Sequence, residues 1–223
     1  MKYLLPLIIA MTLAAADAEA QFFIKKPLEK HVAPGTKVSE FKTDEVITIS
    51  TKLGDVVILL SDRTPKHKAN FIKLAKEGFY DGTTFHRIID NFMIQGGDIN
   101  SKDSIPGNDG QGNIGYTIPA EFDTALTHVQ GAVAAARLGD GVNPMKESSG
   151  SQFYIVENKA GTPFLNQNYT VFGKVLKGIE VVEAIAEQPK GMMDRPLERI
   201  DMKVKVETMS RKEISKLYGV VYQ

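Results

Sequence analysis

The chain of 223 residues contains no cysteine. This absence excludes disulfide bonds, thiolate metal ligands and cysteine nucleophiles. The chain also carries no excess charge, because 27 Lys and Arg residues balance 27 Asp and Glu residues. A basic face is the usual electrostatic footprint of a nucleic-acid-binding protein, so we expect no nucleic-acid partner. A hydrophobic content of 43% suits an ordinary globular domain.

Two catalytic motifs are missing or incomplete. The chain has no Gly-x-Ser-x-Gly sequence of the kind that hydrolases use as a nucleophile elbow. The sequence Gly110-x-Gly112-x-x-Gly115 formally matches a dinucleotide fingerprint, which requires a strand before it and a helix after it. The residues that follow, Tyr116 to Pro119, indicate an extended segment instead. We therefore expect no cofactor and no metal, and interpret residues 99–115 as a loop beside a substrate groove.

The only long apolar run lies at the N-terminus. Lys2 precedes a largely apolar stretch from Leu4 to Ala15, and Ala18-Glu19-Ala20 supplies small residues at the two positions that a signal peptidase reads. We expect a signal peptide over residues 1–20, cleaved after Ala20, and an exported protein that is periplasmic or secreted. An uncleaved anchor is the alternative, although the run is shorter than the ~20 residues of a membrane span.

The rest of the chain divides into three parts. Residues 21–45 contain two prolines and no clean periodicity, which indicates an N-terminal extension or linker. Residues 46–209 are expected to form the main domain. Residues 210–223 are expected to form a helical tail, because Ser210-Arg211-Lys212-Glu213 is a capping box.

Short strands dominate the main domain. Alternating residues and turn signals predict hairpins over Val46–Leu60 and Phe85–Ile94, the second turning at Asp90-Asn91. We expect further strands at residues 131–136, 151–156, 170–176 and 199–206. Helices are expected from Thr64-Pro65 to Gly78 and over residues 179–185. Without a strand–helix–strand rhythm, this order favours a closed antiparallel barrel.

Three residues of the second hairpin do not suit a packed core: His86, Arg87 and Gln95. Arginine is almost never fully buried unless it is paired, so we expect Arg87 to project into a cleft. Alternation places His86 on the opposite face of the strand from Arg87, which indicates a structural role. Asp98 is expected to cap a turn.

Three blocks of sequence, in matching order, resemble cyclophilin-type peptidyl-prolyl cis-trans isomerases. They are Phe85–Ile89 with Phe92–Asp98, Gly150–Ile155, and Phe164-Leu165 with Val171–Gly173. The resemblance covers residues 46 to 208. It implies a mainly β fold, a closed eight-stranded antiparallel β-barrel capped by two α-helices, and no cofactor.

The activity implied by this resemblance is rotation about X-Pro bonds in peptides and in folding exported proteins. Such a bond resists rotation because the nitrogen lone pair is conjugated with the carbonyl. Twisting localises the lone pair, so a donor aimed at nitrogen binds strongly only in the transition state. Arg87 is the expected donor because its guanidinium is rigid and always charged. Gln95 would hold Arg87 and hydrogen-bond the substrate backbone.

The resemblance also implies a substrate site around these two residues. Phe92, Met93, Tyr154 and Leu165 would line an apolar pocket for the proline ring, and Tyr169 its rim. Ala136 and Arg137 stand where the family uses backbone groups to grip the residue before proline. Gln152 and Phe164 would shape the neighbouring groove, whereas Phe153 is expected to point into the core.

Four positions depart from the commoner family pattern. Tyr154 replaces Phe, Phe164 replaces Trp, Tyr169 replaces a His seen in many members, and Arg137 replaces the Asn of eukaryotic members. We expect isomerase activity to persist, inhibition by cyclosporin-type macrocycles to be weak, and the protein to be a monomer. The alternative is a non-catalytic proline-peptide-binding or chaperone module. The combination of Arg87, Phe92 and Gln95 favours the enzyme.

Overall fold

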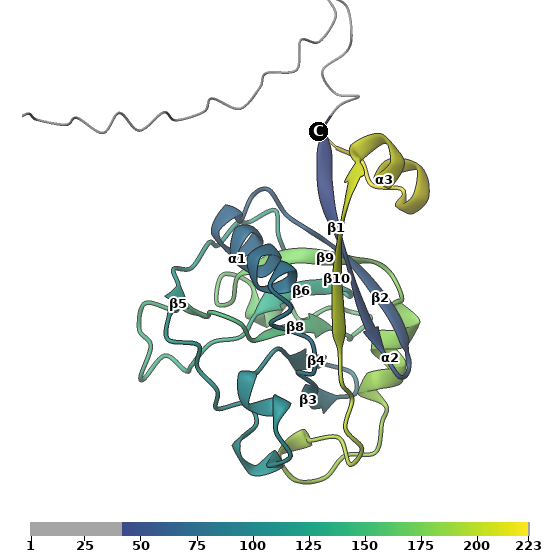
Figure 1. Ribbon diagram of the computed structural model, residues 1–223. Coiled ribbons are helices and arrows are strands. Elements are labelled where there is room, and N and C mark those ends of the chain that lie inside the picture. Colours follow the sequence, from purple (N-terminus) through teal and green to yellow (C-terminus); the bar gives the residue numbers. More distant parts are fainter. Residues whose placement is uncertain (1–41, 223) are drawn as a thin grey trace, which may run out of the picture. The chain divides into compact units, whose positions relative to one another are not determined.

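The computed structural model of the protein describes residues 42–222 (Figure 1). The expected signal peptide, residues 1–20, and the extension as far as residue 41 lie outside the described residues. The strands are β1 (Thr43–Thr51), β2 (Gly54–Leu60), β3 (Phe85–Ile89), β4 (Met93–Gly96), β5 (Thr117–Ile118), β6 (Ala132–Ala135), β7 (Ser148–Ser149), β8 (Phe153–Val156), β9 (Val171–Lys177) and β10 (Lys203–Ser210). The helices are α1 (Pro65–Lys76), α2 (Ile179–Ala186) and α3 (Arg211–Tyr218). Short 3₁₀ turns lie at Ile99–Lys102, Pro106–Asn108, Pro163–Leu165 and Met192–Asp194.

Eight strands form one curled antiparallel sheet in the order β10-β1-β2-β9-β6-β8-β4-β3, while β5 and β7 pair separately (Figure 1). The prediction of a mainly β fold with eight antiparallel strands is confirmed. Closure is partial, because β3 and β10 do not pair along their length. The two edges of the sheet meet at the start of β3 and in the segment before β10, through an isolated bridge between Thr84 and Asp201 and the hydrogen bond from Phe85 N to Ile200 O, 3.0 Å. The sheet is therefore a half-barrel.

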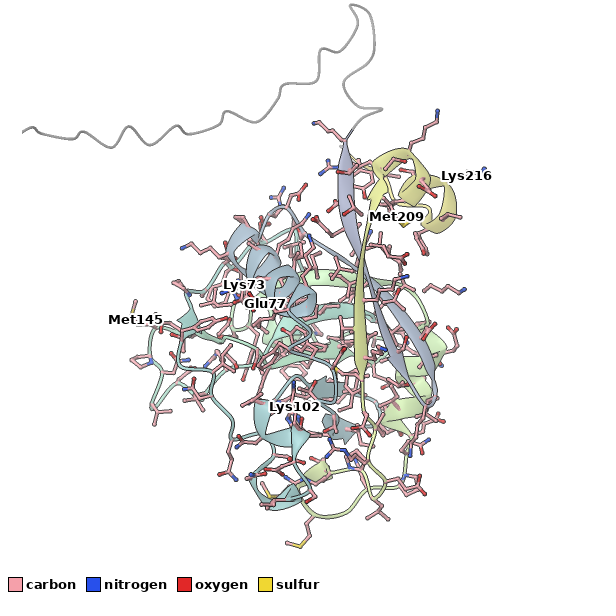
Figure 2. The ribbon with its side chains drawn as sticks, in the orientation of Figure 1. Lys73, Glu77, Lys102, Met145, Met209 and Lys216 are labelled. Atoms are coloured by element: carbon pink, nitrogen blue, oxygen red, sulfur yellow. The ribbon has the colours of Figure 1, made fainter. Side chains whose placement is uncertain are left out.

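The main core fills the inside of the curled sheet. Ile47 and Ile49 of β1 are fully buried there, as alternation predicts, together with Phe153 of β8. Helices α1 and α2 add apolar faces that include Phe71 and Val182. On α1 the opposite side, with Lys73 and Glu77, is exposed to solvent (Figure 2). The two expected helices and the inward orientation of Phe153 are confirmed.

A second apolar cluster lies on the outer face of β1 and β2. Val46, Val57 and Leu59 pack there against Ile214 of α3 and Val220. Ser210 caps this helix, since its hydroxyl oxygen accepts a hydrogen bond from Glu213 N at 3.2 Å. The predicted helical tail therefore completes the burial of β1 on its second face.

Three local expectations differ from the structure. Thr64 precedes α1, but its hydroxyl donates to Ser61 O rather than capping the helix. Strand β10 begins at Lys203, not at residue 199, because residues 200–202 lie beside β3 instead of continuing the ladder with β1. Strand β1 begins at Thr43, ahead of the expected start at Val46. Within residues 42–222, no helix combines the length and apolarity that crossing a membrane requires.

Strand β3 carries a β-bulge at His86. The ladder pairs Phe85 with Gly96 and Arg87 with Gln95, so His86 is an extra residue on its strand. In a regular strand Phe85 and Arg87 would share a face. Here Phe85 is fully buried in the core, whereas the Arg87 side chain is 40% exposed. The bulge therefore turns Arg87 out of the core.

The bulge buries His86 without giving its ring a partner. The side chain is 5% exposed, and among the described residues neither ring nitrogen has a hydrogen-bond partner. Burial lowers the pKa of His86 to about 4, although the nearby Asp98 carboxylate partly offsets this effect. The native state therefore holds His86 in its neutral form at neutral pH.

Stability is expected to fall in acid because of this histidine. The unfolded chain has a His86 pKa of 6.5 and the folded chain one of about 4, so the unfolded state binds more protons between these values. The contribution of neutral His86 to the free energy of unfolding is thus fully present above pH 6.5. It is lost as pH falls toward 4, which lowers the free energy of unfolding by about 3 kcal/mol at most. Urea unfolding at about pH 7 and pH 4.5 should show a smaller loss for His86→Gln than for wild type. Equal losses in the two proteins would contradict the assignment.

Candidate functional site

One row of cross-strand neighbours forms the base of the candidate site. Arg87 of β3 pairs with Gln95 of β4, Gln95 pairs with Tyr154 of β8, and Tyr154 pairs with Ala134 of β6. Directly paired residues project from the same face of a sheet. Because the flanking residues Ile94 and Phe153 face the core, this row lies on the outer face of the sheet.

A cavity of about 140 Å³ with both polar and apolar lining residues lies over this row. Its lining consists of Arg87, Phe92, Met93, Gln95, Ala136, Arg137, Tyr154, Leu165 and Tyr169. All of these residues were expected in the site. Beneath the cavity Met93 and Tyr154 are buried in an apolar cluster with Ala132, Ala134 and Val171. A space of this size holds a small ring, whereas the whole of a drug-sized ligand needs several hundred Å³.

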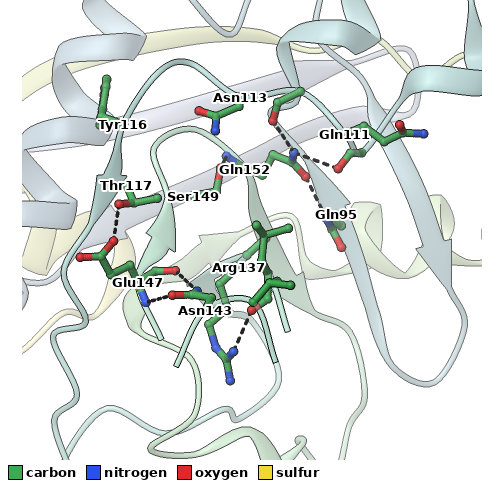
Figure 3. Close-up of a pocket in the computed structure, with 15 residues that line it drawn as sticks. Gln95, Gln111, Asn113, Tyr116, Thr117, Arg137, Asn143, Glu147, Ser149 and Gln152 are labelled. Carbon is green, nitrogen blue, oxygen red and sulfur yellow. Dashed lines mark hydrogen bonds between the residues drawn. The ribbon is translucent and has the colours of Figure 1, made fainter. Parts of the chain in front are cut away.

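The Arg87 guanidinium stands at the edge of this cavity. Its Nη1 donates to Gln95 Oε1 at 3.5 Å, and Gln95 Nε2 donates to Gln152 Oε1 at 3.1 Å. Gln152 Nε2 in turn donates to Gly110 O and Gly112 O, 3.2 and 3.1 Å away. This chain of hydrogen bonds, partly visible in Figure 3, ties Arg87 to the loop that precedes β5.

Asp98 fixes the same loop from beneath. Its carboxylate is fully buried and accepts hydrogen bonds from the backbone N–H groups of Asn100, Gly110 and Gly112. A Cβ atom at Gly112 would lie 1.8 Å from Asp98 Oδ1, so only glycine fits there. The turn-capping role expected of Asp98 thus includes two glycines of the Gly110-x-Gly112-x-x-Gly115 sequence, and the extended β5 follows that sequence in place of a helix.

A second cavity of about 340 Å³ adjoins the first and shares Gln95, Ala136 and Arg137 with it (Figure 3). Of these two cavities, Gln152 lines only the second. The rest of its lining comes from β5 and the loop before it and from β7 and the loop before it: Gly110, Gln111, Gly112, Asn113, Tyr116, Thr117, Leu138, Val142, Asn143, Glu147 and Ser149. The two cavities form neighbouring sections of one groove. Phe164 lines neither; it is 68% exposed and stacks on Phe92 with ring centroids 6.0 Å apart.

Arg137 is held rigidly in the wall between the cavities. Its guanidinium lies 4.5 Å from the centroid of the Tyr169 ring, a cation–π distance. Nε donates to Asn168 O at 2.8 Å, and Nη1 lies 2.6 Å from Asp140 Oδ1. Arg137 is therefore a fixed part of the wall.

The backbone of Ala136 is already bonded within the protein. Its N–H donates to Gln152 O at 3.0 Å, and its carbonyl accepts from Ser149 N at 2.8 Å. The residue was expected to offer backbone groups to a substrate. A carbonyl oxygen has two lone pairs, so only its second lone pair remains for that purpose.

The hydroxyl of Tyr154 belongs to a buried relay behind the cavity that sequence reasoning did not identify. His128 Nε2 lies 2.9 Å from Tyr154 Oη, and His128 Nδ1 lies 2.8 Å from Asn166 Oδ1. The amide oxygen only accepts, so Nδ1 carries the proton and Nε2 accepts from the tyrosine. Burial lowers the pKa of His128 and raises the pKa of Tyr154, which keeps both rings neutral. The presence of Tyr where the family usually has Phe was the one signal for this relay.

Tyr154→Phe is expected to destabilise the protein by about 1–3 kcal/mol, because His128 Nε2 would become a buried acceptor without a donor. Tyr116→Phe is the matched control, since it removes a hydroxyl that donates to Asn70 Oδ1 at the exposed surface. Urea unfolding should show a clearly larger loss for Tyr154→Phe. Equal losses would show that the relay does not stabilise the fold.

Comparison with known proteins gives one consistent family. The sequence model described as "Cyclophilin type peptidyl-prolyl cis-trans isomerase/CLD" matches residues 46–206. The chain is 39% identical over 156 residues to the Arabidopsis thaliana peptidyl-prolyl cis-trans isomerase CYP18-1, covering 69% of this chain and 90% of that protein. It is 35% identical over 216 residues to a putative bifunctional phosphatase/peptidyl-prolyl cis-trans isomerase of Streptococcus pyogenes. That match covers 84% of this chain but 41% of the streptococcal protein.

The fold has solved relatives as well. The crystal structure of a Cryptosporidium parvum cyclophilin type peptidyl-prolyl cis-trans isomerase, in the presence of the dipeptide Ala-Pro, is similar with a TM-score of 0.63 and 28% identity. It covers 73% of this chain and 98% of that one. The family model, the sequence relatives and the fold agree, and the chain belongs to the cyclophilin-type peptidyl-prolyl cis-trans isomerase family.

Proposed function

We propose that this protein catalyses cis–trans rotation about X-Pro bonds, with Arg87 stabilising the twisted imide nitrogen. One observation carries the proposal: a partly exposed guanidinium stands beside a cavity of about 140 Å³ that has the apolar side chains of Phe92, Met93 and Leu165 in its lining. The cavity takes the proline ring, and the guanidinium donates to nitrogen once the bond has left planarity. The interaction is weak in the planar ground state and strong in the twisted state, which is the requirement for catalysis.

The surrounding residues support this chemistry by position. Gln95 accepts from Arg87 Nη1 and is itself held by Gln152, so the donor is oriented before substrate arrives. Met93, Phe92 and Leu165 give the ring an apolar surface. The reaction breaks no covalent bond, so it needs no nucleophile and no proton transfer.

The substrates that fit this site are proline-containing peptides and unfolded or folding polypeptides, because the groove is open and extends into the second cavity. The Ala-Pro dipeptide named with the Cryptosporidium relative is a ligand of the same chemical class. We further propose that the protein is a monomer and that its clients are exported proteins. The apolar run and the Ala18-Glu19-Ala20 sequence support export and a mature chain that begins at Gln21.

Arg87→Ala is the central test of this proposal. Removing a single donor that acts in the transition state typically costs about 10²–10³-fold in rate, so isomerisation of a proline tetrapeptide should collapse while peptide binding persists. Arg63→Ala is the control, because Arg63 pairs with Asp123 at the exposed surface and lines neither cavity. The rate is followed in a proline-isomerisation assay, and binding by calorimetry.

The same pair of measurements separates the enzyme from the alternative, a non-catalytic module that binds proline peptides or acts as a chaperone. Such a module would bind peptide without accelerating isomerisation in the wild type. Full activity in Arg87→Ala would refute the role of the guanidinium.

Phe164→Trp is expected to tighten inhibition by cyclosporin-type macrocycles. Phe164 is exposed at the rim against Phe92 and has no N–H donor. An indole at this position restores both the larger apolar surface and the donor of the commoner family residue, each of which favours binding. The inhibition constant, measured on the same tetrapeptide, should fall at unchanged uninhibited activity. An unchanged constant would refute the link between this residue and weak inhibition.

A further inference from the structure

Besides the amide of Gln95, the Arg87 guanidinium has a charged neighbour, Asp194. Asp194 Oδ2 lies 3.7 Å from Arg87 Nε, while Nη1 is bonded to Gln95. The two contacts engage two different nitrogens of the planar group. Among the described residues, no hydrogen bond engages the remaining nitrogen, Nη2. The guanidinium is thus held at two points and keeps one amino group available.

Asp194 is presented by a compact loop that lies beside β3. Residues 189–197 fold back on themselves, with a bridge between Lys190 and Pro196 and a hydrogen bond from Leu197 N to Pro189 O of 2.8 Å. Lys190 Nζ donates to Ile88 O of β3 at 3.2 Å. The loop is therefore anchored to the residue that follows Arg87 in the chain.

Lys190 also limits how strongly Asp194 attracts Arg87. Its Nζ lies 3.4 Å from Asp194 Oδ1, so the carboxylate is shared between two cations. At 3.7 Å the contact with Arg87 is an ion pair without a hydrogen bond. The guanidinium is oriented by this charge without being drawn out of the cavity.

The backbone of the loop tip is strained. Met193 and Asp194 have φ angles of 61° and 59°, in the left-handed region that residues other than glycine adopt uncommonly, Asn, Asp and His more often than Met. Met193 is 71% exposed, so its own burial does not explain the conformation. Strained residues persist where the surrounding structure holds them, and they cluster at functional sites. The strained conformation is the one that directs the Asp194 carboxylate to Arg87.

We propose that Asp194 is a positioning residue of the isomerase, which fixes the Nε edge of Arg87 so that the free amino group faces the substrate nitrogen. The inference rests on the proposed function and deepens it. Asp194 touches no substrate in this account. Its side chain is 37% exposed and that of Arg87 40%, and ion pairs at such exposure contribute little to stability. Its effect is therefore expected in turnover and not in folding.

Asp194→Asn tests this inference, because asparagine tolerates the left-handed conformation and removes only the charge. We expect kcat/KM on an uncharged proline tetrapeptide to fall roughly tenfold, less than the ~10²-fold that a misplacement of 1 Å can cost. Peptide affinity and the urea midpoint should stay unchanged. Glu198→Gln is the control, since it removes a carboxylate nearby in the sequence that pairs with Lys52 in solvent.

Two further measurements exclude a merely structural effect. In the Arg87→Ala background, Asp194→Asn should cause no additional loss, because the partner that it positions is gone. Added salt should lower the activity of the wild type toward that of Asp194→Asn, since it screens a partly exposed pair. Salt should leave the activity of the variant nearly constant.

The outcomes distinguish this inference from the proposed function. Wild-type activity in Asp194→Asn, or an equal loss in both backgrounds, would overturn the role of Asp194 alone. Full activity in Arg87→Ala would overturn the proposed chemistry and the role of Asp194 together.

Discussion

The site depends on the register in which strands β3, β4 and β8 pair. Arg87, Gln95 and Tyr154 are direct neighbours across three strands, and this pairing places a cation, an amide and an aromatic ring in a line on the outside of the sheet. The bulge at His86 makes that register compatible with the core, because it lets Phe85 point inward while Arg87 points outward. If His86 paired regularly instead of bulging, Arg87 would share the inner face with Phe85 and its guanidinium would turn toward the core, where an unpaired charge is strongly unfavourable.

The rest of the molecule keeps this row rigid. Asp98 orders the loop before β5, the loop carbonyls hold Gln152, and Gln152 holds Gln95. From beneath, the apolar cluster of Met93 and Tyr154 supports the cavity floor. Each polar group is thus fixed by a neighbouring polar group of the protein before a ligand arrives, which is how preorganised sites maintain their geometry.

Local signals in the sequence were sufficient for much of the fold. The hairpins over Val46–Leu60 and Phe85–Ile94 follow from alternation and turn residues, and Asn91 adopts the positive φ that its position in the turn suggested. The start of β10 was misjudged because Ile200 and Met202 alternate with polar residues, although their burial comes from packing beside β3 and not from pairing with β1. Alternation of apolar and polar residues indicates which side chains are buried, but only the structure shows which strand they pack against.

The site was partly predictable for a related reason. Most residues of the cavity lining lie in or beside the three sequence blocks that resemble the family, and the order of these blocks along the chain indicates the family without knowledge of the structure. The bulge at His86 was not predicted, because regular alternation would place Phe85 and Arg87 on one face. His128 and Asp194 reach Tyr154 and Arg87 from distant parts of the chain, and no local pattern encodes such contacts.

The pairing of the first strand with the last has a consequence for how the chain acquires its structure. The outer edge of β1 receives its partner only when β10 is present, with Thr43 beside Ser210. Contacts this far apart in sequence form slowly, because the chain loses the entropy of closing a long loop before the contacts stabilise it. A ribosome that has delivered all but the last strand holds a sheet with an unfinished edge. A chain with this topology is therefore expected to fold slowly and to be exposed to aggregation until its C-terminal strand is paired.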